Sequence, residues 1–170
     1  PSAFVDLCGA GVAFKVAWGV CQRLGDGRRA SPRMREFLKS AVGLAAMGTV
    51  GDVVPLRGEN RILVCYGLKA MRESPLAGLT QLMEVAGLKD KPTLTAEDIG
   101  FSLAPRINAA GRLEDMRLGI ECLLTDDAAQ AHGFAEALHA INAERRGLQD
   151  EMLAAADAVA AFAATCGSLQ

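Results

Sequence analysis

The 170-residue sequence has few aromatic side chains: they make up 5% of it, with one tryptophan and one tyrosine. Its hydrophobic content of 51% comes mostly from alanine, leucine and valine instead. Alanine and leucine favour helices, whereas β-sandwiches draw on aromatic and β-branched residues. The composition therefore predicts a mainly α-helical protein, and the length suffices for one sizeable core.

Paired metal-binding residues and long apolar runs are lacking too. The five cysteines form no Cys-x-x-Cys pair, and neither His132 nor His139 has a cysteine nearby. This pattern predicts reduced thiols and solvated histidines, and it argues against a disulfide frame or zinc knuckle. No run approaches the ~20 apolar residues of a membrane span, and no basic-then-apolar leader opens the chain. We therefore expect a cytoplasmic protein that contacts no membrane.

The formal charge of −2 is small, but it is unevenly distributed. Residues 1–125 hold 16 Lys/Arg against 13 Asp/Glu, whereas residues 126–170 hold 2 against 7. This asymmetry is weaker than the basic footprint of an independent DNA-binding module. Charge alone therefore assigns no nucleic-acid partner.

Capping signals predict where several helices begin and end. The apolar run of residues 12–21 predicts a buried helix. Ser31-Pro32 supplies an N-cap and a proline in the first turn, and we expect that helix to end at Gly48. Residues 62–71 predict another helix, with a short strand over 64–66 as the alternative. Ser74-Pro75 repeats the signal for a helix that stops at Gly87.

The next segments carry a capping box and a proline. Thr95 and Asp98 have the capping-box spacing, and we expect Pro105 to break the helix that they begin. Asp115 is then expected to cap a helix over residues 118–124.

Residues 126–163 predict the longest element, with an acid-rich first turn. Its seam positions are spaced alternately by four and three residues, which forms a narrow stripe over about eight helical turns. The seam comprises Phe134, Leu138, Ile141, Arg145, Leu148, Met152, Ala155, Val159 and Phe162. Such a helix either pairs as a coiled coil or connects two domains, and we favour the connector. Gly133 and Gly147 each lower its stability by roughly 1 kcal/mol relative to alanine, so we expect other protein to support it along its length.

Asp52 is the one carboxylate in the otherwise apolar stretch Gly48–Leu56. An ionised carboxylate is costly to bury without a positive charge or several donors. It is therefore either a cap on a turn or a ligand for a cation in a cleft. Because the predicted helix ends just before it, the macrodipole disfavours a bare anion there, which favours a compensating cation.

Residues 106–113 place two arginines and an amide among small residues. Arginine forks suit phosphate oxygens, and small neighbours let a backbone come close. A tether from an arginine to Glu114 or Asp115 explains the pattern equally well.

Three blocks of the sequence together resemble the RecJ-type single-stranded-DNA-specific exonucleases of the DHH phosphoesterase superfamily. They are Leu7–Lys15, Gly48–Leu63 and Asp98–Met116; residues 141–146 also fit, so the resemblance covers essentially residues 5–160. It implies that residues 1–125 form the helical second half of an α/β DHH-type catalytic domain. Residues 126–163 would be an interdomain connector helix, and 164–170 the start of a further domain.

The resemblance further implies part of a 5′→3′ exonuclease that hydrolyses single-stranded DNA in recombination and repair. Two divalent metals, Mn²⁺ or Mg²⁺, would serve the reaction, and Asp52 corresponds to a metal ligand and catalytic residue. The resemblance also implies a surface that faces the nucleic-acid backbone and does not read its sequence; it comprises Arg106, Asn108, Gly111 and Arg112. It leaves any single-stranded-DNA-binding or repair partner proteins unidentified.

Departures from the family pattern bear on activity. The sequence contains no Asp-x-Asp and no Asp-His-His, and Gly51 stands where the family pattern leads us to expect alanine. We therefore expect an internal piece of a longer protein that neither cleaves DNA nor binds Mn²⁺ tightly alone. Uncovered apolar helix faces should promote association. The alternatives are a catalytically dead scaffold of this superfamily, a small oligonucleotide phosphoesterase, and a generic helical interaction module.

Overall fold

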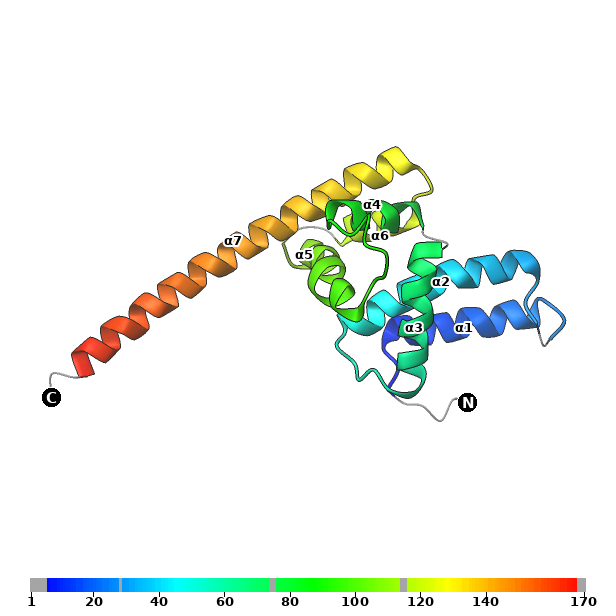
Figure 1. Ribbon diagram of the computed structural model, residues 1–170, viewed down its shortest axis with the longest axis horizontal. Helices are drawn as coiled ribbons and strands as arrows, with labels where there is room; N and C mark the ends of the chain where they lie inside the picture. The colour runs from blue at the N-terminus through cyan, green and yellow to red at the C-terminus, as the bar shows by residue number, and fades with distance from the viewer. Residues whose placement is uncertain (1–5, 28, 74–75, 114–115, 168–170) are drawn as a thin grey trace.

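The computed structural model describes residues 6–27, 29–73, 76–113 and 116–167, and every element in them is a helix (Figure 1), as the composition predicts. For residues 112–113 and 161–167 only the backbone is described. No described helix is both long and apolar enough to cross a membrane. The elements are α1 (Gly9–Arg23), α2 (Pro32–Gly51), α3 (Gly58–Glu73), α4 (Ala77–Val85), the π-helical turn η1 (Asp98–Leu103), α5 (Ala104–Leu113), α6 (Arg117–Leu124) and α7 (Ala128–Gly167).

Two glycines on α2 and α3 set how closely the first three helices pack. A Cβ at Gly48 would lie 2.5 Å from the Cβ of Ala10 on α1. A Cβ at Gly67 on α3 would lie 2.2 Å from the Cβ of Ala46 on α2. Real Cβ atoms do not approach this closely, so only glycine allows these backbone distances. The three helices form a layer that abuts the remaining helices through α2.

The main core lies where α2 and α3 meet α4, η1, α5, α6 and the first part of α7. Its fully buried side chains are mostly aliphatic, and they include Leu79, Leu82, Ile99, Leu103 and Leu138. A Cβ at Gly78 would overlap the carbonyl of Cys122, so α4 and α6 also meet at a glycine. The predicted sizeable core is therefore present, and large aromatic side chains contribute little to it; a smaller second cluster of Phe14, Ala45 and Leu63 lies between α1, α2 and α3.

Two predicted caps, at Ser31 and at Thr95 with Asp98, are confirmed at atomic detail. Ser31 accepts a hydrogen bond from the Met34 N–H at 3.4 Å, and Pro32 opens α2. Thr95 and Asp98 cap each other reciprocally, N–H to side-chain oxygen, at 2.8 and 3.4 Å. The predicted acid-rich first turn of α7 is wrong, because the helix begins at Ala128, after the acids; Asp127 instead caps it and accepts from the backbone N–H groups of Ala129 and Gln130 at 2.8 and 3.0 Å. Ser74-Pro75 and Asp115 lie outside the described residues.

The predicted end of α2 at Gly48 is wrong, because the helix continues to Gly51. Gly48 serves the close approach of α1 instead of a C-terminal turn. Thr49 is fully buried, and its hydroxyl donates to the Ala45 carbonyl at 2.7 Å. This bond to the preceding turn helps to hold Thr49 within the helix. The alternative of a short strand over residues 64–66 is also wrong, since they lie in the middle of α3.

Pro105 does not break its helix, contrary to the prediction. The chain passes through the π-helical turn η1 and enters α5 at Ala104 without interruption. Within this wider turn the Ala104 N–H donates to the carbonyl of Ile99, five residues back. Proline lacks an N–H and crowds the preceding turn, and a π turn is one arrangement that accommodates this.

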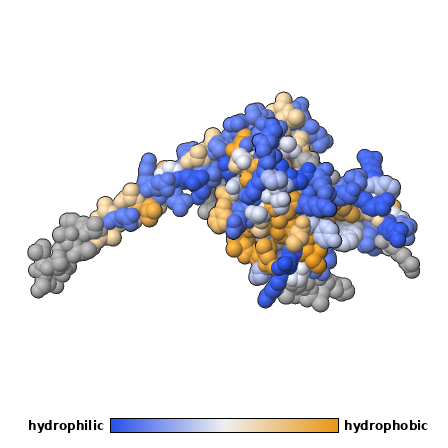
Figure 2. Space-filling model, viewed as in Figure 1, coloured by the Kyte–Doolittle hydropathy of each residue, from blue (hydrophilic) through white to orange (hydrophobic). Residues whose placement is uncertain are grey.

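The predicted long helix is present as α7, but it continues to Gly167 instead of ending at residue 163. Its first part packs on α4, α5 and α6, with Leu138 and Ile141 buried. Beyond Arg145 the seam is exposed, with Leu148 46%, Met152 74% and Val159 69% accessible. Figures 1 and 2 show this distal half extending away from the other helices. The described residues therefore give it none of the support expected along its length.

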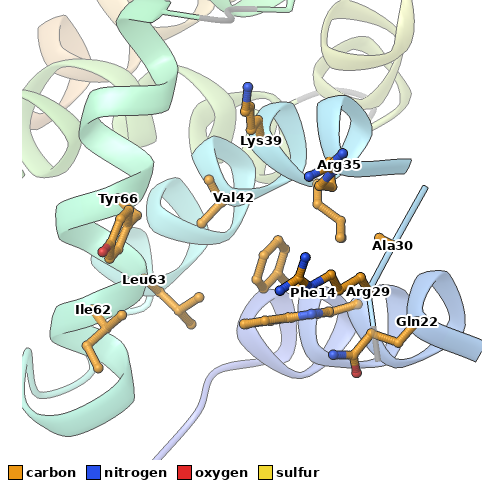
Figure 3. Close-up of a pocket in the computed structure, with 12 residues that line it drawn as sticks. Phe14, Gln22, Arg29, Ala30, Arg35, Lys39, Val42, Ile62, Leu63 and Tyr66 are labelled. Carbon is orange, nitrogen blue, oxygen red and sulfur yellow. The ribbon is translucent and has the colours of Figure 1, made fainter. Parts of the chain in front are cut away.

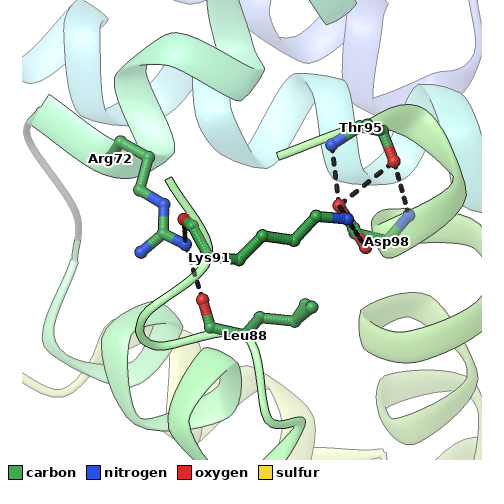
Figure 4. A network of polar contacts seen from close by, with 5 residues as sticks. All are labelled: Arg72, Leu88, Lys91, Thr95 and Asp98. Carbon is green, nitrogen blue, oxygen red and sulfur yellow. Dashed lines mark hydrogen bonds and ion pairs between the residues drawn. The ribbon is translucent and has the colours of Figure 1, made fainter. Parts of the chain in front are cut away.

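A polar network holds the segment between α4 and η1 (Figure 4). The Arg72 guanidinium donates to the carbonyls of Leu88 and Lys89 at 2.5 and 2.7 Å, and to that of Lys91. The Lys91 ammonium in turn lies 2.7 Å from the Asp98 carboxylate. Burial raises the pKa of Asp98, but the Lys91 and Thr95 donors outweigh it and hold that pKa below its ordinary value. The network fixes the start of η1 and hence the direction of α5.

Replacing Asp98 with asparagine should make stability less dependent on acidity. Because the carboxyl has a lower pKa when folded, its contribution is full above its ordinary value of 3.8 and is lost as pH falls through the folded-state pKa. We expect Asp98→Asn to reduce the free energy of unfolding by about 0.5–1 kcal/mol at neutral pH. The gap should close as the pH falls below 3.8 and through the lower folded-state pKa. Urea unfolding at a series of pH values measures it.

Asp90→Asn is the matched control, since Asp90 is an exposed carboxylate in the same segment. Its variant should follow the unmodified chain at every pH. A gap for Asp98→Asn that persists unchanged in acid would contradict the network's charge pairing.

Candidate functional site

Asp52 occupies the C-cap of α2, as the sequence indicates for a residue just past a helix end. Its N–H donates to the Gly48 carbonyl at 2.9 Å, and its side chain is exposed. No described side chain forms a hydrogen bond or ion pair with its carboxylate. The carboxylate therefore stands at the negative end of the helix dipole without a described counter-charge, a position that favours a bound cation.

Val53 follows in a strained backbone conformation. Its φ of 56° places it in the left-handed region, which a β-branched residue rarely adopts. The Val53 side chain is 87% exposed, so burial does not stabilise this conformation. Its N–H donates to the Val50 carbonyl at 3.0 Å, which ends α2 abruptly. Strain of this kind clusters at functional sites, and here it sets the direction of the chain beside Asp52.

A cleft of about 480 Å³ separates the end of α2 from α5 and α6. Asp52, Asn108 and Gly111 all line it, so the structure brings together three of the five predicted site residues. A smaller recess of about 220 Å³, also lined by Asp52 and Asn108, reaches toward Leu44 and Met47. The rest of the larger cleft is mainly apolar and is formed by Gly51, Ile107, Met116, Gly119, Ile120 and Leu123.

Small residues bring the walls of the cleft together. A Cβ at Gly51 would lie 3.3 Å from the Cβ of Ala104, at the junction of η1 and α5. A Cβ at Gly111 would lie 3.1 Å from the Met116 side chain. Alanine at position 51, which the family pattern led us to expect, would make the contact with Ala104 tight, so glycine relieves it here.

Arg106 lies away from the cleft, on the side of α5 that faces α7. Its guanidinium donates to the Ser102 carbonyl at 2.5 Å and contacts His139 Nδ1 at 3.1 Å. It also reaches the Val85 carbonyl of α4 at 3.5 Å. Burial, with a smaller contribution from the Arg146 charge, lowers the pKa of Arg106. These contacts join α4, α5 and α7 through one cation, and His139 is half-buried instead of solvated as predicted.

Arg112 belongs to α5 by its backbone, but its side chain lies outside the described residues. The same holds for the proposed tether to Glu114 or Asp115. The direct role of Arg112 toward nucleic acid therefore stays a prediction.

Asn60 is a positioning residue that sequence reasoning missed. It is fully buried, and its amide Nδ2 donates to the carbonyls of Asp6 and Pro55 at 2.8 and 3.1 Å. It thereby ties the loop that follows Asp52 to the segment that enters α1. Its Oδ1 has no hydrogen-bond partner among the described atoms. The only signal in the sequence is an amide in an otherwise ordinary first helical turn.

Cys8 and Thr49 form a second support behind the site. Cys8 Sγ accepts from the Gly11 N–H at 3.4 Å, which caps α1, and lies 3.6 Å from Thr49 Oγ1 on α2. Both side chains are buried. The Gly48-Thr49 pair of the Asp52 motif thus serves helix packing, whereas Asp52 itself is free to meet a ligand.

The described residues supply only part of a metal centre. A two-metal site needs several carboxylates or histidines about its ions, yet no group of three or more His, Cys, Asp or Glu suited to a metal occurs among them. Asp52 and the Asn108 amide are hard oxygen donors of the type that Mn²⁺ and Mg²⁺ accept. The arrangement fits one edge of such a centre, and no catalytic step follows from it alone.

Comparison with known proteins gives consistent relatives, although no family model matches the chain. The chain is 41% identical over 153 residues to the single-stranded-DNA-specific exonuclease RecJ of Dickeya dadantii. It is 43% identical over 145 residues to RecJ of Thermus thermophilus. These alignments cover 86% and 85% of this chain but 26% and 20% of the relatives. The chain thus spans a fifth to a quarter of the curated relatives it matches.

Solved structures agree with the sequence comparison. A crystal structure of exonuclease RecJ bound to manganese matches 89% of this chain with a TM-score of 0.76 and 40% identity, over 36% of its own length. RecJ of Thermus thermophilus in complex with Mg²⁺ matches 90% with a TM-score of 0.77, over 23% of its length. By sequence and by fold, the chain is therefore a relative of the RecJ-type single-stranded-DNA-specific exonucleases, to which it corresponds over one segment.

Proposed function

We propose that this chain forms part of a metal-dependent exonuclease that hydrolyses the phosphodiesters of single-stranded DNA in the 5′→3′ direction. The observation that carries the proposal is the shared cleft of Asp52 and Asn108, within a segment whose fold and sequence match RecJ. Recombination and repair, in the cytoplasm, are the processes that such an activity serves. In such an enzyme, residues outside this segment would have to supply the remaining metal ligands.

Asp52 is the proposed ligand for one of two divalent cations, Mn²⁺ or Mg²⁺. The relatives' structures with manganese and magnesium support this choice of ion, as does an exposed carboxylate with no described counter-charge. When bound, two such metal ions would activate the attacking water and neutralise charge on the phosphate. This chain's own part is to hold the carboxylate at the strained end of α2.

Asn108, Gly111 and Arg112 are proposed to lie along the DNA backbone. Asn108 and Gly111 border the same cleft as Asp52. Gly111 has no side chain to extend into the cleft. The Asn108 amide can donate hydrogen bonds to phosphate or sugar oxygens, contacts that do not depend on the DNA sequence. Arg106, predicted to contact DNA as well, is better explained as the cation that joins α4, α5 and α7.

A division of the chain into domains belongs to the same proposal. We infer that residues 1–125 belong to the catalytic domain, that residues 126–163 connect it to further structure, and that residues 164–170 begin that structure.

A catalytically dead scaffold would keep this shape without needing a ligand at the end of α2. The unpaired carboxylate of Asp52 beside strained Val53 favours the enzyme.

The isolated chain should show no nuclease activity, because one carboxylate does not hold two metals. Purified chain is incubated with 5′-labelled single-stranded oligonucleotide and millimolar Mn²⁺ or Mg²⁺. We expect no shortened product beyond that of an EDTA-treated sample. Metal-dependent cleavage by the chain that disappears in its Asp52→Ala variant would contradict the expectation.

In a full-length protein that contains this segment, Asp52→Ala should abolish cleavage. Loss of outer-shell support at metal sites already costs 10–100-fold, so we expect the loss of a direct ligand to reduce the rate by more than about a hundredfold. The melting temperature should stay the same, since the side chain is exposed. Asp90→Ala is the matched control at another exposed aspartate. Retained activity in Asp52→Ala would remove this residue from the metal site.

Substitutions at two nearby residues of α5 should differ in their effect on stability, because one residue is assigned to helix packing and the other to DNA contact. Arg106→Ala removes charged hydrogen bonds to two carbonyls and His139, so we expect a loss of about 1–3 kcal/mol in the free energy of unfolding of this chain. Asn108→Ala removes an exposed side chain, and the change should stay within about 0.5 kcal/mol. Urea unfolding measures both. The assignment fails if Asn108→Ala proves the more destabilising.

A further inference from the structure

The loop that leads from Asp52 into α3 turns sharply at both of its ends. At its start Val53 has a φ of 56°, and Gly58, the first residue of α3, has a φ of 52°. Both values lie in the left-handed region, which reverses the direction of the backbone. Between them the Arg57 N–H donates to the Pro55 carbonyl at 2.9 Å. The path of the chain beside Asp52 therefore depends on what holds the middle of this loop.

Asn60 of α3 holds the middle of the loop from the interior. Its side chain is fully buried, and its Nδ2 carries two donor hydrogens. Nδ2 donates to the Pro55 carbonyl, within the loop, at 3.1 Å. It also donates to the Asp6 carbonyl, in the segment that enters α1, at 2.8 Å. One buried amide thus joins the loop after Asp52 to a distant part of the chain.

Two ion pairs beside Asn60 connect the same parts of the chain. Arg57 Nη2 lies 3.2 Å from the Asp6 carboxylate. Lys15 Nζ of α1 lies 2.9 Å from Glu59 Oε2. Both pairs are partly exposed to solvent, and exposed pairs contribute little by themselves. The buried amide, which water does not screen, therefore carries most of this connection.

Apolar packing joins α1 and α3 at the same end of the two helices. A Cβ at Gly11 of α1 would lie 3.6 Å from the Leu63 side chain of α3. Farther along, a groove of about 580 Å³ opens between α1, α2 and α3, and Trp18 and Tyr66 both line it (Figure 3). The end that carries the polar contacts is thus where α3 and α1 hold each other, and it lies next to the Asp52 loop.

We propose that Asn60 is a positioning residue for the cation at Asp52. The inference rests on the proposed function, because it takes Asp52 as a metal ligand. The Asp52 side chain is exposed and accepts no hydrogen bond from a described side chain, so the backbone that carries it sets its position. Helix α2 fixes that backbone before Asp52, and Asn60 fixes the loop after it. A ligand that is held in place before the ion arrives loses less freedom on binding.

The metal dependence of a full-length protein that contains this segment tests the inference. Electron paramagnetic resonance of free Mn²⁺ gives the dissociation constant without DNA, and oligonucleotide cleavage is followed over a range of Mn²⁺ concentrations. In Asn60→Ala we expect the dissociation constant and the Mn²⁺ concentration for half-maximal rate to rise about tenfold, as for other residues that support metal ligands. The rate at saturating Mn²⁺ should fall less, because the ion then orders Asp52 itself.

Met71→Ala is the matched control, because Met71 is buried at the opposite end of the same helix. It should lower the melting temperature and leave the affinity for Mn²⁺ unchanged. Asn60→Ser keeps one donor and should give an intermediate affinity, and it replaces Asn60→Ala if that variant does not fold. In this chain without metal, hydrogen exchange at Val53 should be faster in the Asn60 variant than in Met71→Ala.

The possible outcomes separate this inference from the proposed function. A full-length protein that cleaves DNA with Mn²⁺, but loses affinity for the ion equally in the Asn60 variant and in Met71→Ala, overturns the role of Asn60 alone. Unchanged Mn²⁺ affinity in the Asn60 variant overturns it as well. An unmodified full-length protein that shows no metal-dependent cleavage overturns the proposed function, and this inference with it.

Discussion

The close packing of α2 against its neighbours at Gly48 and Gly67 is the constraint on which the site depends. At both glycines an added methyl would overlap a facing residue, with Cβ separations of 2.5 and 2.2 Å. Because interiors are close-packed and tolerate little overlap, these contacts fix where α2 ends. Asp52 is the C-cap at that end. The backbone of a residue that looks like part of a loop is thus positioned by the helix that it terminates.

The other wall of the cleft is positioned independently. Arg72, Lys91 and Asp98 hold the segment that enters η1, and the π-helical turn then carries the chain into α5 despite Pro105. α5 consequently turns Asn108 and Gly111 toward Asp52, and Arg106 toward α7. Rigid elements hold functional groups more precisely than loops do. Here a carboxylate and an amide, more than fifty residues apart in sequence, border one cleft because the two helices that carry them are each held in place.

Local chemistry made part of this predictable. The caps at Ser31 and Thr95 follow from side-chain oxygens that bond nearby N–H groups, and the sequence around each contains all the information needed to predict it. The continuation of α2 past Gly48 cannot be predicted from the local sequence, because the role of this glycine depends on Ala10 of another helix. The face of α5 that holds Arg106 is likewise decided by tertiary contacts with α4 and α7. The resemblance to RecJ singled out Asp52 and Asn108 as candidates, whereas the burial of Asn60 and the strained backbone of Val53 are visible only in the structure.

The central claim is that the Asp52–Asn108 cleft is where a divalent cation meets this segment. Amide NMR signals of the chain, followed during a titration with Mn²⁺, test it most directly, since the ion's paramagnetism broadens nearby signals even when binding is weak. The account predicts that Val53, Asn108 and Gly111 broaden first, and that Asp52→Asn removes this effect while His139 stays sharp throughout. Broadening that begins elsewhere, or that persists unchanged in Asp52→Asn, would contradict it.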